Sequence, residues 1–239
     1  MQQTDHNTPV KSPPIAFYDL DGTLCSGNIV QRYAFYARSH PSKLRAILRY
    51  GKLVASVPHL MGLELYSRRL FNEVFYGEYR GMKEEWLRGL AEELFERVVR
   101  PTIYAGSKAL VDADSARGFQ PVLVTGELDF AVEPIVRYFG FHAVISNSLF
   151  YRHGTATGRV VPPLIAEREK AAAIEEMCRQ QNAEITQSKA YSDSISDLHM
   201  LEAVGQPAAV NPDRRLKRVA LRRGWSVLDL KNGSPLGPF

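Results

Sequence analysis

Two aspartates stand two residues apart at the end of a short apolar run near the start of the sequence. The run Ile15–Leu20 leads into Asp19-Leu20-Asp21-Gly22-Thr23, where the apolar pattern stops. This pattern predicts a strand buried on both faces of a parallel sheet, and such sheets bind ligands at the carboxyl ends of their strands. One carboxylate could attack a phosphorus atom while the other donates and accepts protons.

A surface turn, a calcium-binding loop or a nucleotide-sugar metal motif would also explain this acidic loop. A calcium loop needs further oxygen ligands at alternating positions, and Leu24, Cys25 and Gly27 do not supply them. Under the catalytic interpretation, two carboxylates beside a phosphate dianion would repel it, so the site would need a divalent cation. Because short motifs also occur in unrelated proteins, a second motif is needed to decide.

A second acidic cluster follows the fourth predicted strand. Asp193 and Asp197 lie four residues apart there, so they share one face if a helix begins between them. Both would then point toward the sheet edge that carries Asp19. Oxygen ligands of this kind favour Mg²⁺. Asp193 by itself could be a helix cap, but a cap does not explain why four aspartates meet at one edge.

The strands and helices that must position these residues alternate along the chain, which is typical of a doubly wound parallel α/β sheet. After Ile15–Leu20, strands are predicted at residues 121–125, 143–146, 190–192 and 208–210. Amphipathic helices are predicted at residues 130–139 and 167–181. Residues 150–160 interrupt this alternation and have the pattern of a small hairpin around His153-Gly154.

The interval between the first two strands has helical patterns and almost no strand pattern. Ser42 could cap its longest helix. The apolar stripes at helical spacing are Leu44, Ile47, Leu48 and Val54, then Leu63, Leu70, Phe71 and Val74, then Trp86, Leu90, Leu94 and Val98. The aromatic residues expected in the core of this region are Tyr33, Phe35, Tyr36 and Tyr66. We therefore predict an α/β core from residues 1–25 and 105–239, with residues 1–13 as a flexible leader, and a helical cap inserted at residues 26–104.

Four segments, in this order, resemble the motifs of the haloacid dehalogenase (HAD) superfamily of phosphatases. They are Phe17–Leu24, Val124–Gly126, Lys170 and Ser192–Asp197. The helical insertion after the first segment is similar to the cap of subfamily IB, which contains the phosphoserine phosphatases. The resemblance implies an HAD-type Rossmann-like core. It also implies a phosphoric monoester hydrolase that works through an aspartyl-phosphate intermediate.

The resemblance implies a role for each matching residue. Asp19 would form the aspartyl-phosphate and Asp21 would be the general acid/base. Thr125 would hold a phosphoryl oxygen through its hydroxyl, and the amides of Leu20 and Gly126 would be further donors. Independent of the resemblance, a strand end that leads into a helix N-terminus is a favourable anion site.

Lys170 would neutralise phosphate charge and restrain Asp19. The simplest alternative for Lys170 is a solvated helix lysine. Lys189 is the rival for the role, but it precedes the fourth strand and should lie away from the carboxyl end of that strand. The residues that would hold Mg²⁺ are Asp19, Asp21 through its main-chain oxygen, Asp193 and, close by, Asp197.

Three positions depart from the phosphoserine phosphatase pattern. Asn28 stands where those enzymes have the glutamate that meets the substrate ammonium, and it carries no charge to replace it. Ser196 stands in place of an asparagine, and Ser192 in place of a common glycine. Phosphoserine is therefore a poor default. The prediction is a phosphatase of a small phosphorylated metabolite, with the substrate open.

The charges of the predicted cap are distributed unevenly. From Arg32 to Arg69, eight basic residues stand against Glu64 alone, a net charge of +7, whereas residues 73–96 carry a net charge of −4. The basic half could concentrate an anionic substrate near the site. It could also contact a membrane surface, since residues 44–65 mix apolar and basic side chains, and a lipid-derived phosphate would then be the substrate. A solvated helix face explains the pattern equally well.

Composition and charge limit the remaining function classes. The chain has 239 residues, of which 45% are hydrophobic and 23% charged, so it can form a packed core. No apolar stretch of about 18 residues could span a membrane. Cys25 and Cys178 lack metal or redox spacing, and the first residues lack an apolar signal core, so we expect a cytoplasmic location.

Two other functions stay open at this stage. Phosphotransfer to an alcohol acceptor would use the same residues as hydrolysis. A nucleic-acid-binding module would fit the net charge of +4, but the sequence has no aromatic-interleaved basic strand or recognition helix, so no nucleic acid is expected as a partner. The oligomeric state cannot be predicted from these patterns.

Overall fold

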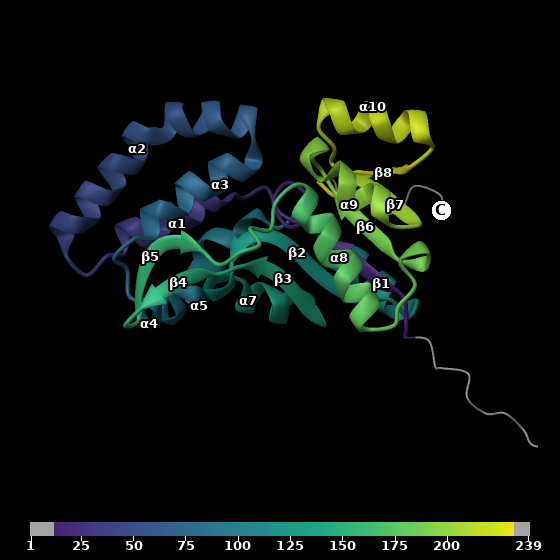
Figure 1. Ribbon diagram of the computed structural model, residues 1–239, viewed down its shortest axis with the longest axis horizontal. Coiled ribbons are helices and arrows are strands. Elements are labelled where there is room, and N and C mark those ends of the chain that lie inside the picture. Colours follow the sequence, from purple (N-terminus) through teal and green to yellow (C-terminus); the bar gives the residue numbers. More distant parts are fainter. Residues whose placement is uncertain (1–11, 232–239) are drawn as a thin grey trace, which may run out of the picture.

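A parallel sheet of six strands within residues 12–231 forms the centre of the fold (Figure 1). The computed structural model of the chain describes these residues, without the side chains of residues 64 and 65. The strand order is β3-β2-β1-β6-β7-β8, and every neighbouring pair is parallel. The strands are β1 (Ile15–Tyr18), β2 (Gln120–Leu128), β3 (Ala143–Asn147), β6 (Lys189–Ser192), β7 (Gln206–Val210) and β8 (Ser226–Leu228). The predicted fold class is confirmed.

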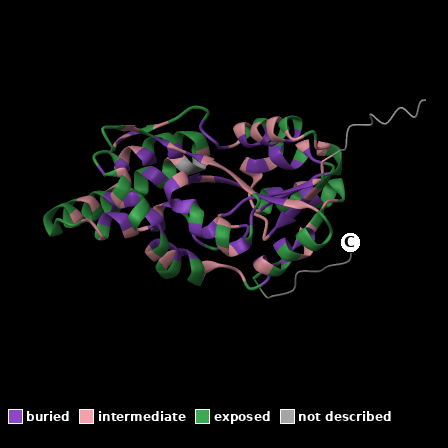
Figure 2. Cartoon of the chain, turned by 90° about the horizontal axis from the view of Figure 1, so that it is seen from below, coloured by how far each residue is buried: buried purple, intermediate pink, exposed green. Residues whose placement is uncertain are grey.

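Helices cover both faces of this sheet. One face carries α6 (Ser107–Ala116) and α7 (Asp129–Phe139), and the other carries α8 (Arg168–Gln180), α9 (Leu198–Ala203) and α10 (Arg214–Arg223). Successive side chains of β1 enter opposite layers, because side chains alternate along a strand. Phe17 packs with α8–α10, whereas Tyr18 packs with α6 and α7. Figure 2 shows the buried residues gathered along the sheet and the inner helix faces.

β8 is the strand that the sequence pattern did not predict. It has three residues, and only Val227 and Leu228 are apolar. A run this short gives no alternation to recognise. It joins the sheet as the neighbour of β7, so its position depends on tertiary contacts.

The predicted hairpin consists of β4 (Leu149–Arg152) and β5 (Thr155–Val160). Its turn residues, His153 and Gly154, have φ values of 48° and 66°. Both lie in the left-handed region that a two-residue hairpin turn requires.

Main-chain hydrogen bonds tie this hairpin to the inserted helical region. Gly81 N donates to Ala156 O at 2.8 Å, and Ala156 N donates to Met82 O at 2.8 Å. Glu84 N donates to Gly154 O at 2.9 Å. In sequence the hairpin belongs to the predicted core. Its main-chain N–H and C=O groups at residues 154 and 156, however, form hydrogen bonds with the predicted cap.

The region between β1 and β2 is helical, as predicted. Its elements are α1 (Ile29–Arg38), α2 (Lys43–Tyr66), α3 (Arg68–Tyr76), η1 (Gly77–Tyr79), α4 (Glu84–Gly89), α5 (Ala91–Leu94), η2 (Phe95–Val99) and η3 (Arg100–Thr102). Two short helical turns complete the core, η4 (Ile185–Gln187) and η5 (Ile195–Asp197). We call residues 26–104 the cap, and these bounds stay a prediction.

Polar side chains cap three of the helices in this region. Asn28 accepts from Gln31 N at the start of α1, and Ser42 accepts from Arg45 N at the start of α2. Each satisfies a backbone donor that has no partner within its helix. Ser67 ends α2 and caps α3. The second apolar stripe predicted for the cap is therefore divided between two helices.

Aromatic rings form the core of the cap. The Tyr33 ring meets Phe75 and Tyr79 edge-on, with centroids 5.5 and 5.0 Å apart. Tyr36 contacts Phe130 of α7 in the same way, at 5.5 Å, so the cap and the α/β core share one apolar cluster. Such edge-to-face pairs stabilise a core beyond the apolar area that they bury.

Two predictions about the cap are wrong. Tyr66 is 83% exposed and takes no part in the aromatic core. The first apolar stripe is also exposed, with Leu44, Ile47 and Leu48 each more than 60% accessible. Instead, Leu53 and Leu60 attach α2 to the cap core. Because α2 is apolar on two faces, periodicity could not identify the face that is buried.

Three further expectations concern the N-terminal leader, the two cysteines and membrane-spanning helices. The predicted leader lies almost entirely outside the described residues. Cys25 and Cys178 are buried and free. Among the helices of residues 12–231, none combines the length and the apolar character that crossing a bilayer requires.

A buried carboxylate joins α6 to two neighbouring strands. Asp114 Oδ2 accepts from the hydroxyls of Tyr18 and Tyr191 at 2.6 and 2.7 Å. Its Oδ1 accepts from Lys189 Nζ at 2.6 Å. All these groups are nearly inaccessible to water, so the carboxylate holds the sheet and the helix together through charge-assisted bonds.

Replacing this carboxylate should destabilise the fold. We expect Asp114→Ala to lower the free energy of unfolding by about 3–5 kcal/mol, because it removes the buried carboxylate that binds Lys189 and both tyrosine hydroxyls. The control is Asp112→Ala on the same helix, where an exposed pair with Lys108 is lost and the change should stay below about 1 kcal/mol. Urea unfolding measures both values; equal effects would contradict the assignment.

Candidate active site

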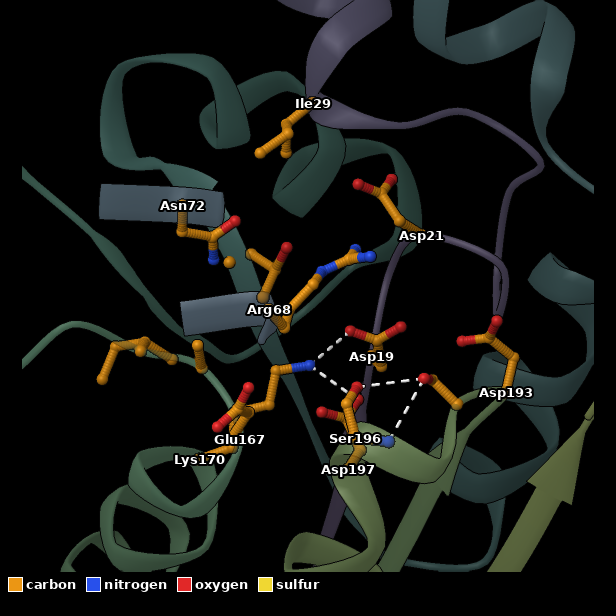
Figure 3. Close-up of a pocket in the computed structure, with 15 residues that line it drawn as sticks. Asp19, Asp21, Ile29, Arg68, Asn72, Glu167, Lys170, Asp193, Ser196 and Asp197 are labelled. Atoms are coloured by element: carbon orange, nitrogen blue, oxygen red, sulfur yellow. Dashed lines mark hydrogen bonds and ion pairs between the residues drawn. The ribbon is translucent and has the colours of Figure 1, made fainter. Parts of the chain in front are cut away.

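Seven of the eight predicted site residues line one pocket at the carboxyl edge of the sheet (Figure 3). They come from the end of β1, from β2, from α8 and from the turn after β6, and they are Asp19, Asp21, Thr125, Gly126, Lys170, Asp193 and Asp197. The eighth, Leu20, has a fully buried side chain and is not part of the lining. The pocket has a volume of about 90 Å³.

The lysine of α8 holds two of the carboxylates. Lys170 Nζ donates to Asp19 Oδ1 at 2.6 Å and to Asp197 Oδ2 at 2.7 Å, and Figure 3 shows it pointing between them. Ser192 Oγ donates to the same Asp197 oxygen at 2.8 Å. Burial disfavours the lysine cation, but the two carboxylates more than offset this, and the pKa of Lys170 is raised. The group therefore stays charged.

The two lysines considered from the sequence have separate roles in the structure. Lys189 pairs with Asp114 on the α6 face of the sheet. Lys170 is the one that reaches the carboxyl edge. The structure therefore places Lys170, the lysine preferred from the sequence, at the pocket.

Lys170 does not offset the full cost of burying the carboxylates around it. Burial raises the pKa of Asp19 to about 6, with Lys170 opposing the rise and Asp197 adding to it. Burial also raises the pKa of Asp193 to about 8, and the charges of Asp19 and Asp197 contribute. Thr23 Oγ1 lies between them, 3.0 Å from Asp19 Oδ2 and 3.2 Å from Asp193 Oδ1. One lysine does not neutralise this many buried acids.

The donor set fits a divalent cation. Burial and neighbouring negative charges raise the pKa values of Asp19 and Asp193, and an additional positive charge between them would stabilise both carboxylates. Carboxylate and carbonyl oxygens are ligands for hard cations. Within residues 12–231, no three Asp, Glu, His or Cys side chains form a metal cluster by themselves. The expected set does not need three, since it uses the main-chain oxygen of Asp21.

A sharp turn brings this loop close to Asp193. Gly22 has a φ of +87°, and a Cβ atom at this position would overlap the Asp193 carboxylate. Any larger residue would displace that carboxylate from Asp19. The glycine of the first motif is therefore required by both backbone conformation and space.

The β2 residues present polar groups to the same pocket. Thr125 Oγ1 accepts from Glu127 N at 3.1 Å, which leaves the hydroxyl hydrogen available for a bound anion. Gly126 O accepts from Asn147 Nδ2 at 3.0 Å and from the Tyr76 hydroxyl. These bonds fix the backbone around Gly126 beside Asp19.

Arg32, which was not among the predicted site residues, binds Asp21, the second aspartate of the first motif. Arg32 Nη1 and Nη2 donate to the two oxygens of Asp21 at 2.8 and 2.5 Å. Nη1 also donates to Glu127 Oε2 at 2.9 Å. Arg32 and Glu127 are each 1% exposed. The two acids outweigh the cost of burying the guanidinium, so the pKa of Arg32 is raised.

A model of the haloacid dehalogenase-like hydrolase family matches residues 16–202, a range that holds all eight predicted site residues. The chain belongs to this family. The expectation drawn from the four motifs is thereby confirmed.

Relatives and a solved structure agree with this family assignment. A Mycobacterium tuberculosis protein whose name describes a phosphatase is 30% identical, over 95% of this chain and 78% of its own. Another, named phosphoserine phosphatase SerB1, is 27% identical over 95% of this chain and 74% of its own. A Bordetella pertussis protein of unknown function has a solved structure with a TM-score of 0.78, 28% identity, and coverage of 92% and 100% of the two chains. The chain is a phosphatase of the haloacid dehalogenase-like family.

Sequence reasoning missed Arg32 and Glu127 as site residues, although both left a signal. Glu127 is a charged residue in the buried strand β2, two residues after Thr125. Arg32 lies on the apolar face of α1, between Ile29 and Tyr36. A charge at a core position of each element indicates a buried pair, but only the fold brings the two residues together.

The cap supplies the wall opposite Asp19 in this family member. Its lining residues are Ile29, Arg68 and Asn72, and Arg68 points from α3 into the pocket (Figure 3). Asn28 is exposed, its side-chain oxygen caps α1, and it is not one of the residues that line the pocket. Among the residues of 26–104 whose side chains the structure describes, none contributes a carboxylate to the pocket lining.

One core residue joins this wall to α8. Glu167 Oε1 accepts from Ser67 Oγ and from Arg69 N, both at 3.2 Å. Its carboxylate therefore sits at the positive N-terminus of α3, which is a favourable place for an anion. The contact links the helix that carries Arg68 to the start of the helix that carries Lys170.

The ion pair between Arg32 and Glu127 can be tested with a double-mutant cycle. We expect Arg32→Met to lower the free energy of unfolding by about 3–5 kcal/mol, because Glu127 is left buried without a cation. Adding Glu127→Leu should recover part of that loss, with a coupling energy above about 1 kcal/mol. Arg88 between Glu84 and Asp129 is the exposed control, and Arg88→Met should cost less than about 1 kcal/mol. Additive effects of the Arg32 and Glu127 changes in urea unfolding would exclude a coupled pair.

Proposed function

We propose that this enzyme hydrolyses a small phosphate monoester with the help of Mg²⁺, through a phosphorylated Asp19. The observation that carries the proposal is the arrangement around Asp19. This carboxylate ends the central strand at the base of the pocket, one oxygen is fixed by Lys170, and Thr125 and Asp21 flank it in the lining. An anchored nucleophile beside phosphate donors suits covalent phosphoryl transfer.

The reaction has two steps, each with a balanced set of atoms. In the first, an Asp19 oxygen attacks the phosphorus, the bond from phosphorus to the leaving oxygen breaks, and Asp21 gives that oxygen a proton. In the second, water attacks the phosphorus of the aspartyl-phosphate, Asp21 takes the proton, and phosphate leaves Asp19. Lys170 offsets negative charge throughout, and Thr125 donates to a phosphoryl oxygen.

Arg32 has a positioning role in this proposal. It binds both oxygens of Asp21, so it fixes the orientation of the acid/base relative to Asp19. Bidentate pairing with a planar guanidinium restricts a carboxylate more than a single bond does.

Mg²⁺ would be held by Asp19, the main-chain oxygen of Asp21 and Asp193, with Asp197 close by. When bound, the ion would neutralise charge between the carboxylates and the phosphate. The support is the set of buried acids, since burial and like charges raise the pKa of Asp193 to about 8.

The pocket encloses the phosphate and the part of the leaving group next to it. Its volume of about 90 Å³ has room for on the order of six water-sized groups, a phosphate included. The cap wall combines the cation of Arg68, the amide of Asn72 and the apolar Ile29. This set suits an uncharged or anionic leaving group better than the ammonium group of phosphoserine. We therefore do not propose phosphoserine as the substrate, although one relative is named phosphoserine phosphatase SerB1.

Asp19→Asn tests the nucleophile. The amide cannot form the aspartyl-phosphate, so hydrolysis of para-nitrophenyl phosphate should fall by at least about a thousandfold. Asp112→Asn, an exposed change on α6, is the control and should keep full activity. Phosphate release is measured in both, with circular dichroism to confirm folding. If folded Asp19→Asn retains activity, the proposal is wrong.

Mg²⁺ removal tests the ion, and stability gives a readout besides activity. The raised pKa values of Asp19 (about 6) and Asp193 (about 8) mean that the folded form binds more protons than the unfolded chain between roughly pH 4 and pH 8. In EDTA, Tm should therefore fall as pH rises through this window. Mg²⁺ should restore both Tm at pH 8 and turnover, and it should have a much smaller effect on Asp193→Asn. An unchanged Tm on adding Mg²⁺ would count against the ligand set.

A further inference from the structure

The outward face of α2 is apolar along most of its length. Leu44, Ile47, Leu48, Val54 and Met61 are between 55% and 70% exposed, and they lie on one side of the helix at helical spacing. The small or apolar residues Gly51, Ala55 and Pro58 are exposed at outward positions between them. A surface helix normally places polar side chains there, and an exposed apolar stripe of this size indicates an interaction surface.

The rotation of α2 is fixed by contacts on its other side. Leu53 and Leu60 are 3% and 4% exposed, facing the cap. Arg49 donates to Glu78 O at 2.8 Å and to Arg80 O at 2.9 Å. Turning the helix to bury the outward stripe would break these bonds and expose both leucines. The stripe is therefore a stable part of the surface, at the margin of the molecule (Figure 1).

Basic residues border this apolar stripe. Lys43 and Arg45 are exposed at the start of α2. Lys52 is exposed further along, paired with Glu78 at 2.7 Å. From residue 43 to residue 63 the sequence contains no Asp or Glu. The outward surface thus combines apolar side chains with positive charge and lacks negative charge along this stretch.

From this combination we propose that α2 docks the protein on an anionic lipid bilayer surface, lying in the interface without crossing it. Apolar side chains would enter the boundary between headgroups and acyl chains, and the flanking cations would meet anionic headgroups. A second copy of the chain fits the stripe less well, because two copies would bring cations together with no acid in residues 43–63 to pair with them. The proposal is independent of the catalytic proposal.

α10 offers a matched comparison within the same chain. It carries six basic residues, more than α2, but Leu221 is the exposed large apolar residue on it. If net positive charge alone bound a membrane, α10 would be the stronger site. If an apolar stripe flanked by cations is required, α2 is the site. Substitutions in the two helices therefore separate the two causes.

The test uses the full chain and sedimentation with vesicles. The wild-type protein should bind to vesicles that contain both phosphatidylcholine and phosphatidylglycerol. It should bind much less to vesicles of phosphatidylcholine alone. Ile47→Asp should weaken binding to the anionic vesicles by at least about tenfold, because it places a charge within the inserted face. Leu221→Asp is the control and should bind as wild type does. Both variants should keep the wild-type Tm and circular dichroism spectrum, which are independent of any catalytic activity.

The charge component is tested separately. The double change Lys43→Glu and Arg45→Glu should reduce binding to anionic vesicles, and higher salt should reduce wild-type binding, since salt screens exposed charges. Arg215→Glu with Arg218→Glu on α10 is the control and should have little effect.

Three outcomes would overturn the proposal. The first is wild-type protein that does not sediment with anionic vesicles. The second is binding that survives Ile47→Asp but is lost with the α10 variants. The third is a dimer in analytical ultracentrifugation that Ile47→Asp dissociates, with no vesicle binding, which would assign the face to a second copy.

Discussion

The contact between Lys170 and the two aspartates is the interaction on which the site depends. It joins α8, β1 and the turn after β6 through bonds of 2.6 and 2.7 Å. Three elements distant in sequence are thereby held at one edge of the sheet. A buried cation between two carboxylates is favourable only when all three groups are present and correctly oriented. The same contact that orders the carboxyl edge therefore also fixes one oxygen of Asp19, while the other oxygen accepts from Thr23 Oγ1.

A second buried cation extends this order into the cap. Arg32 of α1 binds Asp21 of the core loop and Glu127 of β2. The first helix of the insertion is thus anchored by charge next to the loop that carries Asp21. Lys170 and Arg32 divide the acids between them, one holding Asp19 and the other Asp21. This division gives two nearby carboxylates different surroundings, as a nucleophile and an acid/base require.

The sequence predicted five of the six sheet strands, the hairpin and seven of the fifteen residues that line the pocket, because these features have local patterns. Apolar runs ending in acidic loops placed Asp19 and Asp193 at strand ends, and chain order alone separated Lys170 from Lys189. Arg32 and Glu127 could not be paired in this way, since 95 residues separate them. The buried face of α2 was misidentified for a different reason. Both of its faces are apolar, and packing against Leu53 and Leu60 selects between them.

The attachment of the β4–β5 hairpin has a mechanical consequence for the cap. The chain enters and leaves the cap side by side, where Ser26 N donates to Thr102 O at 2.8 Å. Two adjacent connections would make a hinge. The bonds from residues 81–84 to the hairpin add a third fixed point away from that hinge, and three points resist rotation where two permit it. Rotation of the cap as a rigid body about its two connections would therefore break these main-chain bonds.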